Sequence, residues 1–271
     1  ELRIPGFSKD NMAQQPQIVV GLLVTREGFP LGYEVFPGNT FEGKTMLPML
    51  DEFAAAHHVA MPTVVADAAM LSHELLEEIT ARGLSYIVGA RLGTSPLNLT
   101  AKISTALGQR DGAMIRVPSK HGDMVCSFSD KRYRKDKRTL EAQVAKAKSL
   151  VKKGEPGKRS KFVKQASGKD GYVFNEELFN KATSLLGIKG YCTNIPRKEL
   201  PDAEVIARYH DLWQVEKAFR MAKNDLAARP IYHRTQMAVR SHILICFVAM
   251  IMGRSIELAT GKPLRRVIDE L

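Results

Sequence analysis

The chain has 271 residues, of which 44% are hydrophobic, so it is long enough for a substantial core and too apolar to be disordered. Its three cysteines lie far apart in the sequence, which argues against a disulfide framework or a zinc site and fits a reducing cytoplasm. The longest apolar run, residues 243–252, is about half the length that a bilayer requires. We therefore expect a soluble protein without a membrane partner, in which this run forms a buried core helix.

The net charge of +11 is concentrated in one segment. Residues Lys131–Lys169 contain 15 Lys or Arg and three acids, whereas the rest of the chain is close to neutral. Such a cluster predicts binding to nucleic acid, whose phosphates attract cations. The alternative is a solvated basic loop that binds nothing specific.

The first third of the chain alternates strand and helix patterns. Two β-rich runs, Gln17–Thr25 and Leu31–Phe36, flank a Gly/Pro turn and predict a hairpin. A helix to about His58, a strand over 63–66, a helix over 71–82 and a strand over 86–89 follow. This order predicts an α/β fold with a mixed sheet flanked by helices.

The pattern changes after Arg91. Short strands are predicted over 114–117 and 124–128, and the basic segment contains a helical stripe at Leu140, Val144, Ala147 and Val151. Gly154–Gly157 should interrupt that helix. A strand over 190–193 comes next, and Pro201-Asp202 favours a helix that starts near residue 202 and runs unbroken past residue 216.

The stretch from Tyr209 to Lys223 is unusual on its polar side. At 3.6 residues per turn, one side carries two aromatic residues, one acid and two cations: Tyr209, Trp213, Glu216, Arg220 and Lys223. The other side is apolar and should face the core. A simple interpretation is an i,i+4 ion pair between Glu216 and Arg220, with the aromatics covering a loop.

Asp67 follows directly after the buried strand pattern over residues 63–66. Ligands and metals gather outside the carboxyl ends of strands in open α/β sheets, so this carboxylate is a candidate ligand. An Asp in this place also commonly ends a strand or caps the next turn. The position alone does not separate the two interpretations.

The spacing Tyr209-x2-x-x3-Glu216-x6-Lys223 resembles the Tyr-x2-Arg-x3-Glu-x6-Lys signature of one branch of bacterial insertion-sequence DDE transposases. Leu212 stands where that signature has Arg. The similarity extends to three upstream segments and two downstream ones: Gly6–Asp10, Gly38–Thr40, Val64–Met70, Leu226–His233 and Ser241–Phe247. It therefore covers nearly the whole chain.

The resemblance implies a ribonuclease-H-like fold with an insertion domain between the second and third acids. We expect three parts: residues 1–91 and 189–271 form the catalytic core, and residues 92–188 form a basic insertion. Asp67 and Glu216 would be the second and third acids, both catalytic and both metal ligands. The first acid belongs to an opening strand upstream of residue 6, so we expect this chain to be a fragment that lacks it.

In-line displacement at phosphorus explains the need for acids. Two divalent ions, Mg²⁺ or Mn²⁺, stabilise the attacking and leaving oxygens, and hard ions prefer carboxylates. The DNA-contacting residues would be of two kinds, aromatics that stack on bases and cations that bind phosphates. They are Tyr209, Trp213, Arg220, Lys223, Lys131, Arg132, Arg134, Lys135, Lys137 and Arg138.

The predicted function is cleavage and strand transfer of DNA at transposon ends, by a homodimer assembled on DNA. Two alternatives remain open. One is a DNA-binding remnant without catalysis, which would need the basic segment but no acids. The other is a ribonuclease-H-like nuclease that cleaves DNA without joining it. A strand-transfer assay separates them from a transposase.

Overall fold

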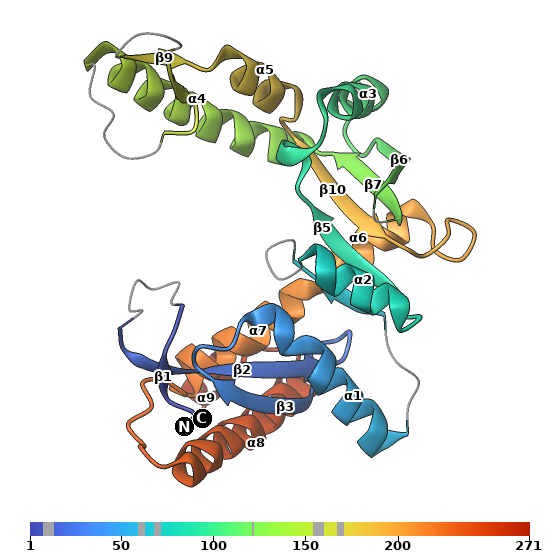
Figure 1. Cartoon of the computed structure of the whole chain (residues 1–271). Helices are drawn as coiled ribbons and strands as arrows, with labels where there is room; N and C mark the ends of the chain where they lie inside the picture. Colours follow the sequence, from blue (N-terminus) through green and yellow to red (C-terminus); the bar gives the residue numbers. More distant parts are fainter. Residues whose placement is uncertain (8–13, 59–62, 68–71, 121, 154–159, 167–170) are drawn as a thin grey trace. The chain divides into compact units, whose positions relative to one another are not determined.

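The computed structural model describes residues 1–7, 14–58, 63–67, 72–120, 122–153, 160–166 and 171–271 (Figure 1). The chain forms two compact units, each with its own core. Unit 1 combines residues 1–84 with residues 207–271, and unit 2 comprises residues 85–206. The three-part division expected from the sequence remains a prediction.

Unit 1 begins with an antiparallel sheet in the order β1-β2-β3. Strands β2 (Pro16–Val24) and β3 (Pro30–Pro37) form the predicted hairpin, and β1 (Ile4–Pro5) pairs with the start of β2. Gly28 makes the turn possible because its φ of 80° lies in the left-handed region. The hairpin packs on helix α8 (Gln236–Thr260), with Val35 and Val239 in one buried cluster.

The next elements of unit 1 also follow the sequence prediction. A short 3-10 turn, η1 (Glu42–Lys44), precedes helix α1 (Met46–His57), which ends at His58 in a left-handed conformation. Strand β4 (Val64–Ala66) and helix α2 (His73–Ala81) follow. Ser72 caps α2, because its Oγ accepts a hydrogen bond from the Leu75 amide at 3.2 Å.

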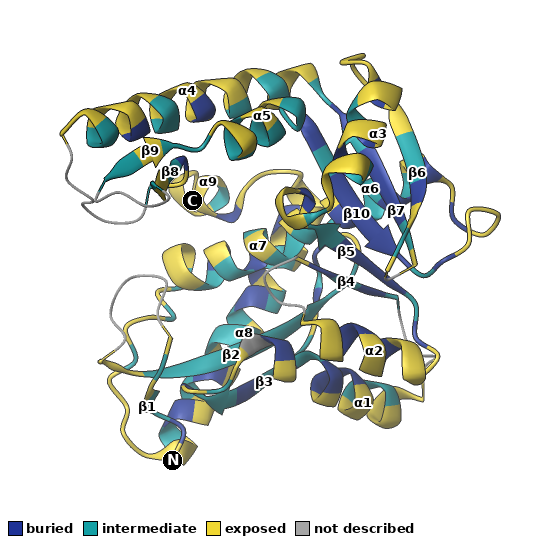
Figure 2. Cartoon of the chain, turned by 45° about the horizontal axis from the view of Figure 1, so that its top comes forward, coloured by how far each residue is buried: buried dark blue, intermediate teal, exposed yellow. Residues whose placement is uncertain are grey.

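A five-stranded mixed sheet runs in the order β4-β5-β10-β7-β6. Its strands in unit 2 are β5 (Tyr86–Ala90), β6 (Met114–Ser119), β7 (Gly122–Phe128) and β10 (Ile188–Thr193). Strand β10 pairs antiparallel with both β5 and β7. The central strands are buried (Figure 2). The turn η2 (Leu92–Thr94) and helix α3 (Leu97–Leu107) follow β5, and α3 contacts β6 and β7.

The basic segment forms helix α4 (Asp130–Lys153), which has a small core of its own in unit 2. Leu140 and Ala147, two members of the predicted stripe, are buried beside Phe162. Strands β8 (Val163–Gln165) and β9 (Tyr172–Phe174) and helix α5 (Glu176–Ser184) complete this subassembly. The predicted break at 154–157 and parts of the resemblance segments 6–10 and 64–70 lie outside the described residues.

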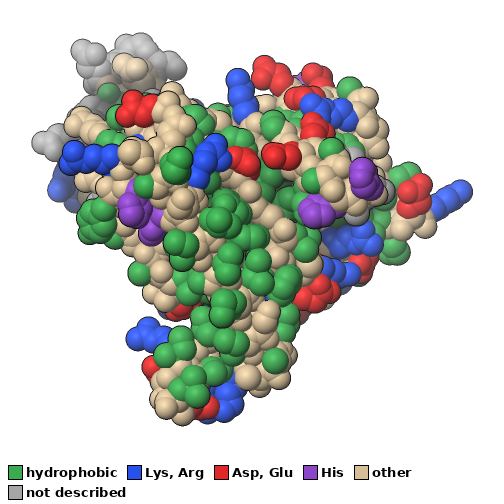
Figure 3. All heavy atoms as spheres, turned by 90° about the horizontal axis from the view of Figure 1, so that it is seen from below, with side chains coloured by type: hydrophobic (Ala, Val, Ile, Leu, Met, Phe, Trp, Pro, Cys, Tyr) green, Lys and Arg blue, Asp and Glu red, His purple; other side chains and the backbone are tan. Residues whose placement is uncertain are grey.

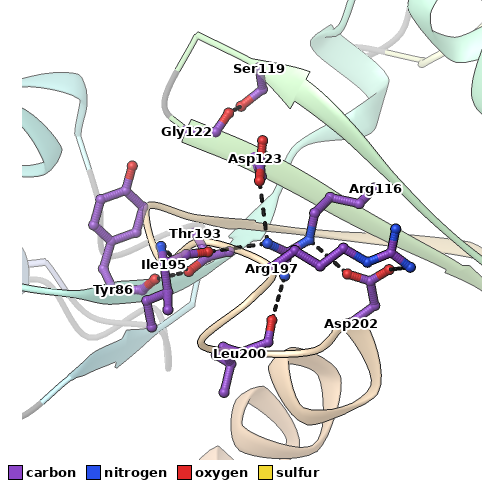
Figure 4. Close-up of polar contacts among 10 residues, drawn as sticks. All are labelled: Tyr86, Arg116, Ser119, Gly122, Asp123, Thr193, Ile195, Arg197, Leu200 and Asp202. Atoms are coloured by element: carbon purple, nitrogen blue, oxygen red, sulfur yellow. Dashed lines mark hydrogen bonds and ion pairs between the residues drawn. The ribbon is translucent and has the colours of Figure 1, made fainter.

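Helix α6 (Asp202–His210) begins at a buried guanidinium in unit 2 (Figure 4). The Arg116 Nε donates to Asp202 Oδ1 at 2.7 Å, and its two terminal nitrogens donate to the carbonyls of Ile195 and Leu200. Arg116 and Asp202 side chains are 6% and 8% exposed. The predicted helix start near residue 202 is therefore confirmed, and an ion pair fixes it.

The prediction of one long helix around Glu216 is wrong. Helix α6 ends at His210, α7 covers Leu212–Arg220, and a π-helical turn, η3, covers Met221–Asp225. The chain tightens at the junction because the Gln214 amide bonds the carbonyl of Asp211, three residues back. Arg26 pairs with the Asp211 carboxylate at 2.7 Å, which ties this junction to the hairpin of unit 1.

The prediction of a buried core helix around Ile243 is only half right. Helix α8 buries Val239, Ile243 and Met250 on one side, and the short helix α9 (Leu264–Asp269) packs against it. Its opposite side is apolar and exposed. By length and composition alone α8 would suit a membrane span, with 22% of its most apolar window buried, but a single such helix is weak evidence.

Candidate active site and basic surface

Asp67 lies where the sequence predicts, directly after strand β4. Val64 and Ala66 are buried and hold the strand in the core, whereas Asp67 is exposed. The Tyr209 hydroxyl donates a hydrogen bond to Asp67 Oδ1 at 3.3 Å. The β4 end and the α6 end of unit 1 thus meet at this carboxylate.

Tyr209 does not share the exposed face that was predicted for it. Its side chain is only 6% exposed, because α6 turns its last residues towards the core before the junction at Asp211. A ring so deeply buried offers little surface for base stacking. The structure gives Tyr209 a hydrogen bond to Asp67 instead.

Glu216 lies in the middle of helix α7, on the exposed side. The opposite side of α7 packs into a cluster that contains Ala218 and Met221, as its apolar pattern predicts. Next to Glu216, Lys217 pairs with Glu257 of α8 at 2.6 Å. Core packing and an ion pair therefore fix the helix while the Glu216 carboxylate faces solvent.

Trp213, Glu216 and Arg220 form the exposed polar side of α7. Trp213 is 52% exposed, and the two charged residues are exposed as well. Among the described residues, no ion pair or hydrogen bond involves Glu216 or Arg220, so the simple i,i+4 interpretation is not realised there. Both charges are available to a ligand.

Lys223 follows in the π-helical turn η3. Its Nζ lies 5.7 Å from the centre of the Phe219 ring, within the range of a cation–π contact. The five-residue hydrogen-bond spacing of this turn breaks the 3.6-residue period that was used to place Lys223 beside Arg220. Lys223 is nevertheless exposed.

The two acids suit Mg²⁺ in their chemistry. Mg²⁺ prefers oxygen donors and is usually held by one or two carboxylates together with water and substrate phosphates. Asp67 and Glu216 are exposed carboxylates that provide such donors. Across the described residues, no group of three or more His, Cys, Asp or Glu gathers into a ready-made metal cluster. Each of the two carboxylates is therefore a donor of the kind that Mg²⁺ prefers.

Two of the three cysteines, Cys126 and Cys192, belong to the core rather than to a reactive site. Cys126 and Cys192 are buried in β7 and β10. Burial, and in second place the nearby Cys192, raises the pKa of the Cys126 thiol to about 12. Burial also raises the pKa of Cys192. These thiols stay protonated at neutral pH and are poor nucleophiles and metal ligands.

Helix α4 carries the basic surface of unit 2. All six of its predicted DNA-contacting residues are exposed, and Arg132 also pairs with Asp136 at 3.3 Å. An open groove runs along one side of the helix, opposite the buried Leu140 and Ala147. Its cationic lining residues fall on one side of the helix and are Lys131, Arg134, Lys135, Arg138 and Lys146.

Sequence reasoning missed two features of this surface and of α7. Lys146 lies within the predicted basic segment but was not among the individual contact residues; it lines the cationic groove, and the i+8 spacing from Arg138 was a usable signal for it. The Lys217–Glu257 pair that holds α7 joins residues 40 positions apart, so no local pattern indicates it. Glu257 looks in sequence like an ordinary exposed acid at the end of a helix.

Comparison with known families identifies the class of the chain. A family model described as the transposase DDE domain matches residues 7–252. The chain therefore belongs to the transposase DDE domain family. No curated protein sequence is significantly similar to it. Membership of this family points to transposase-type function, with DNA as the substrate and divalent metal in general use.

Proposed function

We propose that this chain is the catalytic region of an insertion-sequence transposase, which cleaves DNA at transposon ends and transfers the freed strand to a target. The observation that carries the proposal is the Glu216 carboxylate, which is exposed and unpartnered within a DDE domain. Its helix, α7, is fixed by the ion pair between Lys217 and Glu257. In the proposed architecture the core is ribonuclease-H-like and residues 92–188 form the insertion. A cytoplasmic location follows from the class.

Asp67 and Glu216 would hold the metal, Mg²⁺ or Mn²⁺. When bound, such an ion polarises the phosphoryl oxygen and lowers the pKa of a bound water. A second ion would need donors in addition to these two carboxylates. The Tyr209 hydroxyl donates a hydrogen bond to Asp67 and so orients that carboxylate. Tyr209 is therefore a positioning residue.

The reaction has two balanced steps. In cleavage, a water oxygen attacks the scissile phosphorus and the 3′ oxygen leaves as a hydroxyl. In joining, that 3′ hydroxyl attacks a phosphodiester of the target, forms a new bond to its 5′ phosphate and frees a target 3′ hydroxyl. Arg220 and Lys223 bind the non-bridging phosphate oxygens, and Trp213, half exposed, stacks on a base.

The basic face of α4 would bind the DNA backbone. Its cations extend from Lys131 to Lys146, which at 1.5 Å per residue is roughly 22 Å of helix. That length suits several successive phosphates rather than one small anion. The contact would be independent of base sequence, because Lys and Arg on a phosphate backbone carry no sequence information.

The experiment is a cleavage and strand-transfer assay on DNA that carries the element's terminal sequences. It uses the full-length protein. With Mg²⁺ present, Asp67→Asn and Glu216→Gln should each abolish both steps while DNA binding is kept. Glu270→Gln, a change at another exposed acid, is the matched control and should stay active.

Two other outcomes would replace the proposal. Salt-dependent binding without any metal-dependent cleavage would favour a DNA-binding remnant. Cleavage without joined products would favour a ribonuclease-H-like nuclease. Joining that survives in Glu216→Gln would contradict the catalytic assignment itself.

A further inference from the structure

Helix α8 carries a single histidine, His242, next to a long apolar stretch. The following residues, Ile243 to Gly253, include no charged side chain, and hydrophobic side chains lie on the exposed side of the helix as well (Figure 3). His242 itself is half-buried. A polar side chain in such surroundings normally has a hydrogen-bond partner, and the identity of that partner indicates its role.

The partner of His242 is a backbone carbonyl outside α8. Its Nε2 atom lies 3.1 Å from the Ala228 oxygen and 3.7 Å from the Sγ of Cys246, one turn further along the helix. A carbonyl oxygen can only accept, so Nε2 carries the proton and donates the hydrogen bond to Ala228. The rings of His242 and His233 lie beside each other, with their centres 5.4 Å apart. His242 thus joins α8 to the segment that follows η3.

Ala228 in turn closes the π-helical turn that carries Lys223. Its amide donates to the Ala222 carbonyl at 2.9 Å, and the Leu226 amide donates to the Met221 carbonyl at 3.0 Å. A hydrogen bond that reaches six residues back across a left-handed residue is the arrangement of a Schellman cap. The Ala222 carbonyl belongs to the same peptide group as the Lys223 nitrogen. The cap therefore fixes the backbone from which the Lys223 side chain projects.

The residue at the left-handed position of this cap is an alanine. Ala227 has a φ of 48°, whereas glycine usually occupies this place, because a Cβ is unfavourable there. The cap is thus strained, and a strained conformation persists only where the surrounding structure holds it. The hydrogen bond from His242 to the next residue, Ala228, is a contact of this kind.

The far end of the same segment is held by other residues. The His233 carbonyl accepts a hydrogen bond from Arg3 at 2.7 Å, and Ile231 packs in a cluster that contains Val239 and Ile243. These contacts begin three residues after Ala228. They hold the segment on unit 1, whereas the contact of His242 is made at the cap.

We propose that His242 is a positioning residue for the reaction: it holds the strained cap at Ala227 and so directs Lys223 to the phosphate. The part of the inference that concerns the phosphate rests on the proposed function, because that function gives Lys223 its role. The hydrogen bond and the cap exist without DNA, so the two parts can be measured separately.

Hydrogen exchange of the Ala228 amide, followed by NMR in the full-length protein without DNA or metal, tests the cap. His242→Leu removes the donor, and protection of this amide should fall roughly 5- to 10-fold, as expected for the loss of one ordinary hydrogen bond. His242→Gln should keep the protection, because its longer side chain brings an NH2 donor close to the place of Nε2, whereas His242→Asn is too short and should not. Unchanged protection in His242→Leu would overturn the proposal.

A second substitution separates this role from simple packing of the imidazole ring. Glycine adopts the φ of residue 227 without strain, so Ala227→Gly should restore the protection of Ala228 in the His242→Leu background. A packing defect on α8 would not be repaired by a change at residue 227. Failure of Ala227→Gly to restore protection would therefore contradict the strained cap. His73→Leu, at an exposed histidine on α2, is the matched control and should leave the protection unchanged.

Strand transfer by the same variants tests the consequence for the reaction. In His242→Leu, kcat should fall on the order of 10- to 100-fold, as expected when a phosphate-binding group moves by about 1 Å, and Ala227→Gly should recover it. Duplex affinity should stay equal, because the basic groove of α4 is unchanged. Lost protection together with full activity in His242→Leu would show that the cap does not position Lys223. An inactive wild type would refute the proposed function and the role of Lys223, while the exchange measurement would still decide on the cap.

Discussion

Glu257 of α8 accepts three hydrogen bonds, one of which joins α8 to α7 through Lys217, and its replacement tests how the helix of Glu216 is held. The Oε2 atom accepts from Lys217 Nζ at 2.6 Å and from Arg254 at 2.7 Å, while Oε1 accepts from the Leu264 amide at 3.1 Å. In Glu257→Gln one oxygen becomes an NH2 donor. The single remaining carbonyl can serve either the cations or the amide, but not both.

The size of the effect follows from the burial of the three side chains. Glu257 and Arg254 are 7% and 11% exposed, and breaking a buried ion pair costs about 3–5 kcal/mol. Lys217 is 34% exposed, so water screens its ion pair with Glu257 and reduces the contribution of that pair to stability. The Gln side chain also keeps some of the hydrogen bonds. We expect a loss of about 2–3 kcal/mol in the free energy of unfolding, or roughly 5–10 °C in Tm.

Chemical denaturation at pH 7 measures this loss directly. Trp213 is the single tryptophan of the chain and lies on α7, so its fluorescence reports on the helix concerned. Glu270→Gln is the matched control, because Glu270 also pairs with two cations but on the exposed surface. An unfolding midpoint of Glu257→Gln equal to that of the wild type would refute the account of how α7 is fixed.

The contribution of Glu257 to stability should also depend on pH. Burial alone would raise the pKa of Glu257, but the hydrogen bonds from Lys217, the Leu264 amide and Arg254 outweigh it and lower that pKa. A lowered folded-state pKa contributes stability above the unfolded pKa, and that stability is lost as the pH falls through the folded pKa. The difference between wild type and Glu257→Gln should therefore be full at pH 7 and shrink below about pH 4.5.

Three further predictions concern the start of α6, the hairpin turn and the basic groove. Arg116→Lys cannot reproduce the hydrogen bonds to Asp202 and two carbonyls. It should lower the free energy of unfolding by about 2 kcal/mol or more, measured by denaturation followed by circular dichroism. Gly28→Ala has to adopt a φ of 80° with its Cβ only 2.7 Å from the Gln214 side chain, and should cost about 1–3 kcal/mol; wild-type stability would contradict this. Lys135→Ala should reduce the slope of log K against log salt for duplex DNA by about 0.9, and an unchanged slope would remove Lys135 from the phosphate contacts.

Local patterns were enough to predict most elements of the fold. The β2–β3 hairpin, the end of α1 at His57, strand β4 and the start of α6 each depend on residues close together in sequence. Alternation, caps and turn residues act over a few positions, so a single sequence carries them. The stripe at Leu140 and Ala147 was found for the same reason.

The failures occurred where tertiary contacts override local preference. No residue in 209–223 is a strong helix breaker, yet the helix is interrupted at Asp211, which pairs with Arg26 of a distant turn. The same interruption explains why Tyr209 is buried against Asp67 instead of lying beside Trp213. The exposed side of α8 was missed because an apolar run was equated with burial, which holds only when a partner covers every side.

The most direct test of the central claim is Mg²⁺-dependent strand transfer by the full-length protein, comparing wild type with Glu216→Gln on DNA that carries the element's ends. Duplex binding should be equal in the two proteins, because the basic groove of α4 is unchanged. Joined product should form only with wild type. Equal amounts of joined product from both proteins would show that Glu216 is not the acid that the reaction uses.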